Sequence, residues 1–248
     1  MSASAQPEPT PAEPENKCPD CVFMKLAGES SVETRQWLLQ RVQQIELYVT
    51  LNFNEQWEEL PAGRIKFGIR RGELRLTLEN GRIPYENREW NDTFDLSISK
   101  ERQTREAEKK KGSGKASAAS GGELKAEKTA SLENTAETTD KFQFSVAQVT
   151  TKGSEEEPGW DFEEKTGEQV LKGTISNQKL AAVEVNGKPC TIKATFGVSE
   201  RDIYVSGAEG LWRSDISRNK KAIIERLFVL RRLKSKFNPY VSRQELTI

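Results

Sequence analysis

The chain has 248 residues, with 38 lysines and arginines balanced by 38 aspartates and glutamates, and it contains no histidine. This length predicts one large domain or two small ones. Because histidine is absent, catalytic triads and dyads built on histidine, histidine-ligated zinc centres and histidine general bases are all excluded. Hydrophobic residues make up 35% and charged residues 31% of the chain, which indicates that part of it is not packed into a core.

The sequence has no recognisable targeting signal. Its start, MSASAQPEP, lacks a basic or an apolar stretch, so we expect no secretory signal. No run of about 18 apolar residues occurs, so we expect no membrane span. Three cysteines are an odd number and do not suggest a disulfide framework. Together these features predict a cytoplasmic protein.

Two segments have the composition of disordered chain. Residues 1–28 hold five of the ten prolines and are acidic, which predicts a disordered tail. Residues 100–140 lack aromatic side chains and include a Gly/Ser-rich stretch, which predicts a disordered charged linker or insertion. The basic part of this linker, residues 100–115, carries seven basic and three acidic residues.

The ordered part is expected to begin with a short helix and to continue as strands. Ser30 and Glu33 fit a capping box, which predicts a helix from Val32 to about Gln40. Apolar and polar residues then alternate, which predicts strands. The alternating stretches lie at 45–53, 65–69, 74–78, 83–85, 94–98, 142–146, 160–162, 171–175, 183–185, 192–198 and 203–205. Asn-Gly pairs at 80–81 and 186–187 predict hairpins.

This pattern of roughly ten short strands predicts a mainly β fold, an antiparallel β-sandwich or a barrel-like pair of sheets. We assign residues 29–99 and 141–212 to the two halves of one β domain, because each half alone would be a thin sheet with exposed edges. Two separate small β domains are the alternative.

The C-terminal segment, residues 213–248, is predicted to be a basic helix and a tail. Ser217 can cap a helix from about Arg218 to Lys236. The stretch 213–243 carries ten basic and two acidic residues. Apolar residues at helical spacing are expected to face inward, and these are Ile223, Leu227, Leu230, Leu233 and Phe237. Ile224 and Phe228 project from the other side of the same helix, so the helix is either wedged between the sheet and another element or contacts a partner chain on this second side. We favour contact with a partner chain.

Cys18 and Cys21 form a Cys-Pro-Asp-Cys motif, which is half of a zinc site or a redox dithiol. A structural zinc ion needs four ligands, and only Cys190 remains, so zinc would require ligands from two chains. We interpret the pair as incidental and expect no cofactor.

Three tryptophans, Trp90, Trp160 and Trp212, lie near predicted strand ends. They are candidates for exposed stacking surfaces, and the alternative is that they close the ends of the core. The acidic stretches 155–157 and 161–164 are candidates for a metal-dependent hydrolase, and the alternative is that they are solvated.

The sequence therefore favours a non-catalytic binding or assembly module, whose C-terminal helix contacts a partner protein or another copy of the chain. The candidate apolar anchors are Ile224 and Phe228, and the candidate charged contacts are Arg218, Lys220, Lys221, Arg226, Arg231, Arg232 and Lys234. The alternative is a nucleic-acid-binding accessory protein that uses the same helix and the 100–115 segment. A metal-dependent hydrolase is the third hypothesis.

Overall fold

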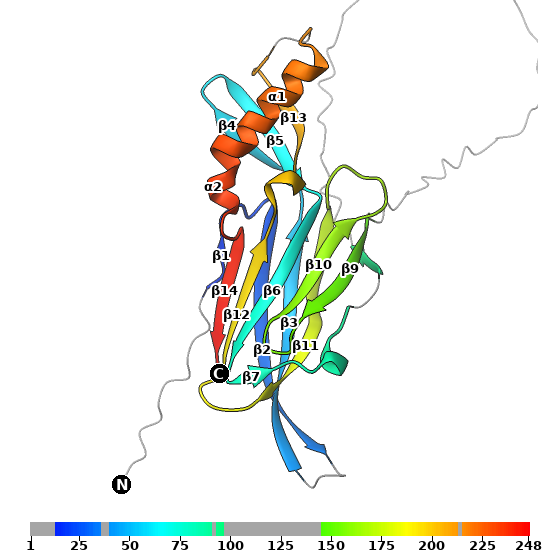
Figure 1. The fold of residues 1–248 in the computed structure, drawn as a ribbon, viewed down its shortest axis with the longest axis vertical. Coiled ribbons are helices and arrows are strands. Elements are labelled where there is room, and N and C mark those ends of the chain that lie inside the picture. The colour runs from blue at the N-terminus through cyan, green and yellow to red at the C-terminus, as the bar shows by residue number, and fades with distance from the viewer. Residues whose placement is uncertain (1–12, 36–39, 91–92, 97–144, 213–214) are drawn as a thin grey trace, which may run out of the picture. The chain divides into compact units, whose positions relative to one another are not determined.

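A computed structural model describes residues 13–35, 40–90, 93–96, 145–212 and 215–248. The described residues form a mainly antiparallel β structure with a C-terminal helix, as the alternating pattern predicts (Figure 1). The predicted linker at 100–140 lies outside these residues. Within the described part, no helix is both long and apolar enough to cross a bilayer.

The strands form three sheets. The seven-stranded sheet A has the order β1 (Glu15–Asn16), β14 (Ser242–Thr247), β12 (Thr191–Gly197), β6 (Arg71–Glu79), β10 (Pro158–Glu164), β9 (Ser145–Gly153) and β8 (Thr93–Leu96). The four-stranded sheet B has the order β2 (Val22–Arg35), β3 (Gln40–Phe53), β11 (Gly173–Val185) and β7 (Gly81–Arg82). The three-stranded sheet C has the order β13 (Ile203–Glu209), β5 (Gly63–Ile69) and β4 (Gln56–Leu60). Every sheet combines strands from before and after residues 97–144.

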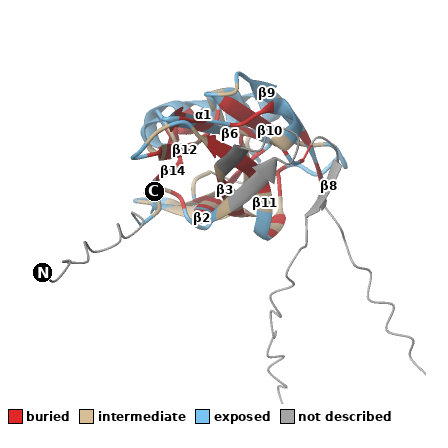
Figure 2. Cartoon of the chain, turned by 90° about the horizontal axis from the view of Figure 1, so that it is seen from below, coloured by how far each residue is buried: buried red, intermediate tan, exposed pale blue. Residues whose placement is uncertain are grey.

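The core lies between sheets A and B. Alternate residues of β6 and β12 are buried, because strand side chains point to opposite faces and only one face meets the other sheet. Phe53 of β3 packs on Phe162 of β10 and on Phe196 of β12, with ring centroids 5.7 and 5.6 Å apart. Figure 2 shows the buried residues gathered between the layers.

The two Asn-Gly pairs do not form the predicted hairpins. Asn80 follows β6 of sheet A, and Gly81 begins β7 of sheet B. Asn186 likewise lies between β11 of sheet B and β12 of sheet A. Asn80 adopts a left-handed φ of 60°, and its carbonyl oxygen accepts the N–H of Asn186 at 2.9 Å. Both pairs are therefore corners where the chain crosses between sheets, and they contact each other.

The predicted N-terminal helix is wrong. Its residues up to Arg35 belong to β2, and Gln40 begins β3. Residues 36–39 lie outside the described residues. The predicted disordered tail is also too long. Residues 13–28 include β1 and the first half of β2. Val22, Met24 and Leu26 alternate and are buried, so this stretch has a core-facing side despite its acidic, Pro-rich beginning.

Side-chain amides complete the hydrogen bonding of the outer edge of β2. The N–H of Met24 donates to Oδ1 of Asn16 at 2.9 Å, and Nδ2 of Asn16 donates to the Met24 carbonyl oxygen at 3.3 Å. The N–H of Leu26 donates to Oε1 of Gln244 at 2.6 Å, and Nε2 of Gln244 donates to the Leu26 carbonyl oxygen at 3.0 Å. Each amide thus occupies the place of a neighbouring strand and joins the edge of sheet B to sheet A.

Sheet C is joined to sheet B at Glu55, directly before β4. The carboxylate lies 3.0 Å from Nζ of Lys66 on β5 and 2.8 Å from Nζ of Lys172, directly before β11. Partial burial opposes ionisation of Glu55, but hydrogen bonds from Lys172, Ser206 and Lys66 outweigh it and lower the pKa of the carboxyl group to about 2.

Gln244 gives a first prediction. The substitution Gln244→Leu removes the hydrogen-bond partners of both the backbone N–H and the carbonyl oxygen of Leu26. We therefore expect it to lower the free energy of unfolding by about 1–3 kcal/mol. Gln148→Leu on the exposed side of β9 is the matched control and should cost less than about 0.5 kcal/mol. Urea denaturation measures both, and equal stability of the two variants would contradict the role of the Gln244 amide.

Glu55 gives a second prediction. Because its pKa is lowered on folding, its contribution to stability is present above the unfolded pKa near 4.5 and is lost as the pH falls towards 2. Glu55→Gln should therefore lower the free energy of unfolding by up to about 3 kcal/mol at pH 7 and have little effect near pH 2. The control is Glu59→Gln, on the exposed side of β4. A pH-independent difference between wild type and Glu55→Gln would refute this account.

Candidate interaction surface

The C-terminal helix is a continuous helical segment of three parts: α1 (Arg218–Phe228), η3 (Val229–Leu233) and α2 (Lys234–Phe237). It begins as predicted, because the N–H of Lys220 donates to Oγ of Ser217 and so caps the first turn. The part η3 is a π-helical turn, in which the N–H of Lys234 donates to the carbonyl oxygen of Val229, five residues earlier.

The π turn decides which side chains face inward. It winds fewer degrees per residue than an α-helix, so residues after it are rotated relative to the predicted helical wheel. The buried residues of the C-terminal helix are Phe228, Val229, Leu233 and Phe237. The prediction that Leu233 and Phe237 face inward is confirmed, whereas the inward placement of Ile223, Leu227 and Leu230 is wrong. Phe228, predicted as an outward anchor, is also corrected to a core residue.

Four large aliphatic side chains of the C-terminal helix are exposed, and we call them the aliphatic stripe. Their exposed fractions are 59% for Ile223, 39% for Ile224, 43% for Leu227 and 40% for Leu230. Among the described residues, Tyr85 is the only other large apolar side chain with comparable exposure. An unburied cluster of this kind marks a surface that gains free energy when another molecule covers it.

The C-terminal helix is fixed to sheet C by its last turns. The ring of Phe237 packs edge-on against Phe67 of β5, with centroids 6.1 Å apart. Nζ of Lys236 lies 2.6 Å from the carboxylate of Glu58 on β4. These contacts, together with the buried Leu233, hold the helix in place while α1 projects beside β13 (Figure 1).

A groove of about 480 Å³ lies between the C-terminal helix and β13. Its lining combines apolar and charged side chains, namely Glu200, Arg201, Ile203, Tyr204, Val205, Glu225, Arg226, Val229 and Leu230. The β13 residues could not be predicted as part of this surface, because they precede the helix in the chain and show only the alternation of an ordinary strand. The groove borders Leu230, so it is continuous with the aliphatic stripe.

The predicted charged contacts of the C-terminal helix are all exposed, and Arg226 lines the groove. Lys221 forms an ion pair with Glu225, and Lys234 forms one with Glu200 of η2 (Glu200–Asp202). The remaining candidates have no ion pair with any described residue, and they are Arg218, Lys220, Arg226, Arg231 and Arg232. These five cations are available to contact a partner. Because exposed ion pairs contribute little to stability, Lys221 and Lys234 can also exchange their carboxylate partners at little cost.

Two of the three candidate tryptophans are not surface residues. Trp160 is fully buried, and its Nε1 donates to the carbonyl oxygen of Glu89 at 3.0 Å. Trp90 is buried and packs edge-on against Phe162 at 6.1 Å. Trp212 is half-buried, with Nζ of Lys221 at 6.0 Å from its ring. An indole has a large apolar area, which accounts for burial at strand ends.

Cys18 and Cys21 are buried in a turn that leads into β2, where the N–H of Cys21 donates to the carbonyl oxygen of Cys18. Burial raises the pKa of the Cys18 thiol to about 11 and also raises that of Cys21. Both groups are therefore thiols at neutral pH, whereas metal binding and redox exchange need the thiolate. Within the described residues, no group of three or more cysteine or carboxylate side chains is placed to hold a metal ion.

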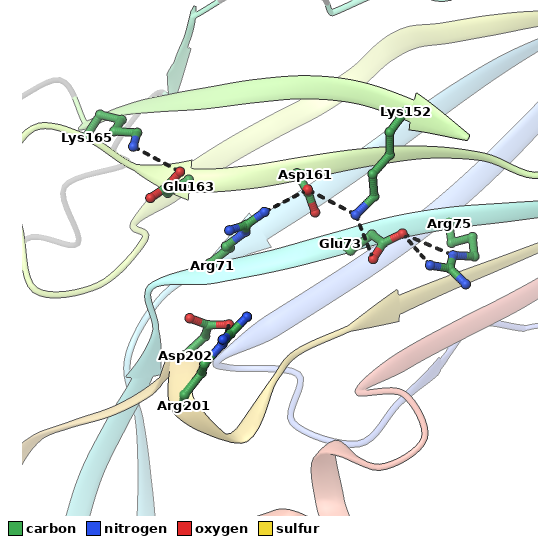
Figure 3. Close-up of polar contacts among 9 residues, drawn as sticks. All are labelled: Arg71, Glu73, Arg75, Lys152, Asp161, Glu163, Lys165, Arg201 and Asp202. Atoms are coloured by element: carbon green, nitrogen blue, oxygen red, sulfur yellow. Dashed lines mark hydrogen bonds and ion pairs between the residues drawn. The ribbon is translucent and has the colours of Figure 1, made fainter. Parts of the chain in front are cut away.

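Of the candidate acidic residues, Asp161 and Glu163 form ion pairs on the outer face of sheet A (Figure 3), and Glu155 lies 3.5 Å from Arg82 of β7. Asp161 lies 2.9 Å from Arg71 and 3.0 Å from Lys152, and Lys152 also contacts Glu73. Partial burial opposes ionisation of Asp161, but hydrogen bonds from Lys152 and Arg71 outweigh it and lower the pKa of its carboxyl group. These carboxylates alternate with cations, an arrangement that favours a structural role over a catalytic pair.

No protein-family model and no curated protein matches this chain. Among solved structures, the membrane-inserted form of Clostridium perfringens NetB toxin aligns with 75% of this chain and 93% of its own, at 9% identity and a TM-score of 0.26. Clostridium perfringens delta-toxin aligns with 75% of this chain and 87% of its own, at 8% identity and a TM-score of 0.22. Both TM-scores lie below 0.5, so neither similarity supports an inference about this chain.

The two faces of the C-terminal helix give a third prediction. Leu233→Ala should lower the free energy of unfolding by about 2–5 kcal/mol, because it leaves a cavity in the core. Leu230→Ala, three residues earlier, should cost less than about 1 kcal/mol because Leu230 is 40% exposed and its truncation leaves no enclosed cavity. Thermal and urea denaturation compare the two variants. If Leu230→Ala were the more destabilising change, the π-helical turn would not separate the two faces.

Proposed function

We propose that this chain is a non-catalytic binding or assembly module that recognises a partner protein, or a second copy of itself, through the C-terminal helix. The exposure of the aliphatic stripe is the observation that carries this proposal. A soluble chain rarely leaves large aliphatic side chains together in water unless a contact covers them. The absence of histidine from the sequence supports a binding role over a catalytic one.

The way the C-terminal helix is held favours binding. Leu233 and Phe237 anchor it in the core, and Lys236 pairs with Glu58. A contact surface that is already ordered before association loses less conformational entropy when the partner arrives. The stripe is therefore a preorganised apolar surface that can bind without further folding.

Nucleic acid is the second candidate partner, because Arg226, Arg231 and the other cations without an ion pair could contact phosphates. The aliphatic stripe between these cations favours a protein. Phosphate contacts need no aliphatic side chains, and covering Ile223 and Leu227 with a phosphate backbone would bury little of their surface.

The fourth prediction tests the proposed function. We expect the double variant Ile223→Ser/Leu227→Ser to lose partners that the wild-type chain captures from its native source. Tyr85→Ser is the control, because Tyr85 is 62% exposed, against 59% for Ile223 and 43% for Leu227, and lies outside the C-terminal helix. Thermal denaturation should show all three proteins equally folded. Point variants are needed because removal of 218–248 would also remove β14, which lies between β1 and β12 in sheet A.

Two results would contradict the proposed function. The first is unchanged capture of every partner by the double variant together with an unchanged sedimentation coefficient. The second is binding to duplex DNA or RNA, measured by fluorescence anisotropy at two salt concentrations, that weakens steeply with salt and is unaffected by Ile223→Ser/Leu227→Ser. The second result would assign the surface to nucleic acid.

A further inference from the structure

The charge around the aliphatic stripe restricts what can cover it. Of the eight basic residues of the C-terminal helix, Lys221, Lys234 and Lys236 have carboxylate partners. Arg226 and Arg231 lie beside the stripe, are exposed and form no ion pair with any described residue. A partner that covers the stripe must approach these cations closely, so a partner with nearby acidic groups is favoured by electrostatic complementarity.

The spacing of the stripe is that of a helix-pairing surface. Ile223, Leu227 and Leu230 follow one another at intervals of four and three residues, which is the spacing of core positions in paired helices. Arg226 directly precedes Leu227 on α1, and Arg231 directly follows Leu230 in η3, so both cations are next to stripe residues in the chain. In paired helices, charged residues beside the apolar seam contact those of the facing helix, and their charges decide which helices pair.

Two other occupants fit this surface less well. If two copies paired through α1, Arg226 and Arg231 of one copy would face cations of the other, and like charges at flanking positions oppose pairing. A flat bilayer covers a convex surface, whereas Leu230 and Arg226 border a groove of about 480 Å³ against β13. A concave groove of this kind accepts a side chain of a protein partner.

We propose that the aliphatic stripe binds an amphipathic helix of a partner protein, with acidic residues flanking its apolar seam and one apolar side chain in the groove beside Tyr204. This assignment rests on the proposed function and specifies the chemistry of the partner. Arg226 and Arg231 select the acidic helix, and Leu227 supplies the centre of the apolar contact.

The fifth prediction tests the charge of the partner directly. Two synthetic peptides about three heptads long both carry Ile and Leu at the core positions, one with Glu and the other with Lys at the flanking positions. Fluorescence anisotropy titrations with the full chain should show at least about tenfold tighter binding of the Glu peptide. Leu227→Ser should abolish binding of both peptides.

Charge reversal provides the decisive comparison. Arg226→Glu/Arg231→Glu should invert the preference, so that the Lys peptide binds more tightly. Lys165→Glu/Lys188→Glu, in the loops after β10 and β11, makes the same change in net charge and should leave the preference for the Glu peptide intact. Equal affinity for both peptides, no binding of either, or no inversion in the Arg226→Glu/Arg231→Glu variant would overturn the assignment.

The peptide titrations and the capture of partners from the native source together distinguish a failure of the acidic-helix assignment from a failure of the proposed binding function. If neither peptide binds but partners captured from the native source are still lost in Ile223→Ser/Leu227→Ser, the binding role stands and the acidic helix is wrong. Co-sedimentation with phosphatidylserine vesicles that Leu227→Ser abolishes would assign the surface to an anionic membrane instead and would likewise overturn the acidic helix.

Discussion

The packing of sheet A against sheet B is the interaction on which the rest of the structure depends. Neither sheet can bury its apolar face alone, and Phe53 contacts aromatic rings of two strands in the opposite sheet. The chain crosses between the sheets at Asn80 and Asn186, so each sheet contains strands from distant parts of the sequence. Sheet C continues from these strands through Arg70 and η2, and it carries the C-terminal helix. The position of the aliphatic stripe is thus a consequence of the core.

The strand alternation and the start of the C-terminal helix were predictable from the sequence, whereas strand neighbours and helix phase were not. The alternation around Phe53 and the cap at Ser217 are confirmed, but the capping-box pattern of Ser30 and Glu33 lies within β2, so a local capping pattern alone does not specify a helix. A period of two shows which side chains share a face but not which strand lies alongside, so the Asn-Gly corners were interpreted as hairpins. The π-helical turn is defined by backbone hydrogen bonds such as the one to Val229, which leave no mark on residue spacing, and the helical wheel therefore placed Leu230 with Leu233.

The candidate surface combines two features that are costly when they occur separately. Exposed aliphatic groups promote nonspecific association, and like charges on one helix repel each other. Placed together, the cations beside Leu227 keep the surface hydrated and discourage contact between copies, while the apolar groups supply binding energy to a suitably charged partner. The specificity of such a surface would come from Arg226 and Arg231 and its affinity from the stripe.

The π-helical turn also fixes how α1 is rotated about its own axis. The C-terminal helix has apolar residues on two sides, and η3 determines which of them meets the core. If the same residues formed a regular α-helix, α1 would be rotated by about 100° relative to α2, because the π-helical turn takes up one extra residue. Deletion of one residue within 229–233 would instead let a regular α-helix form with nearly the present rotation between α1 and α2. A related chain that is one residue shorter here and lacks the turn would therefore still expose the stripe.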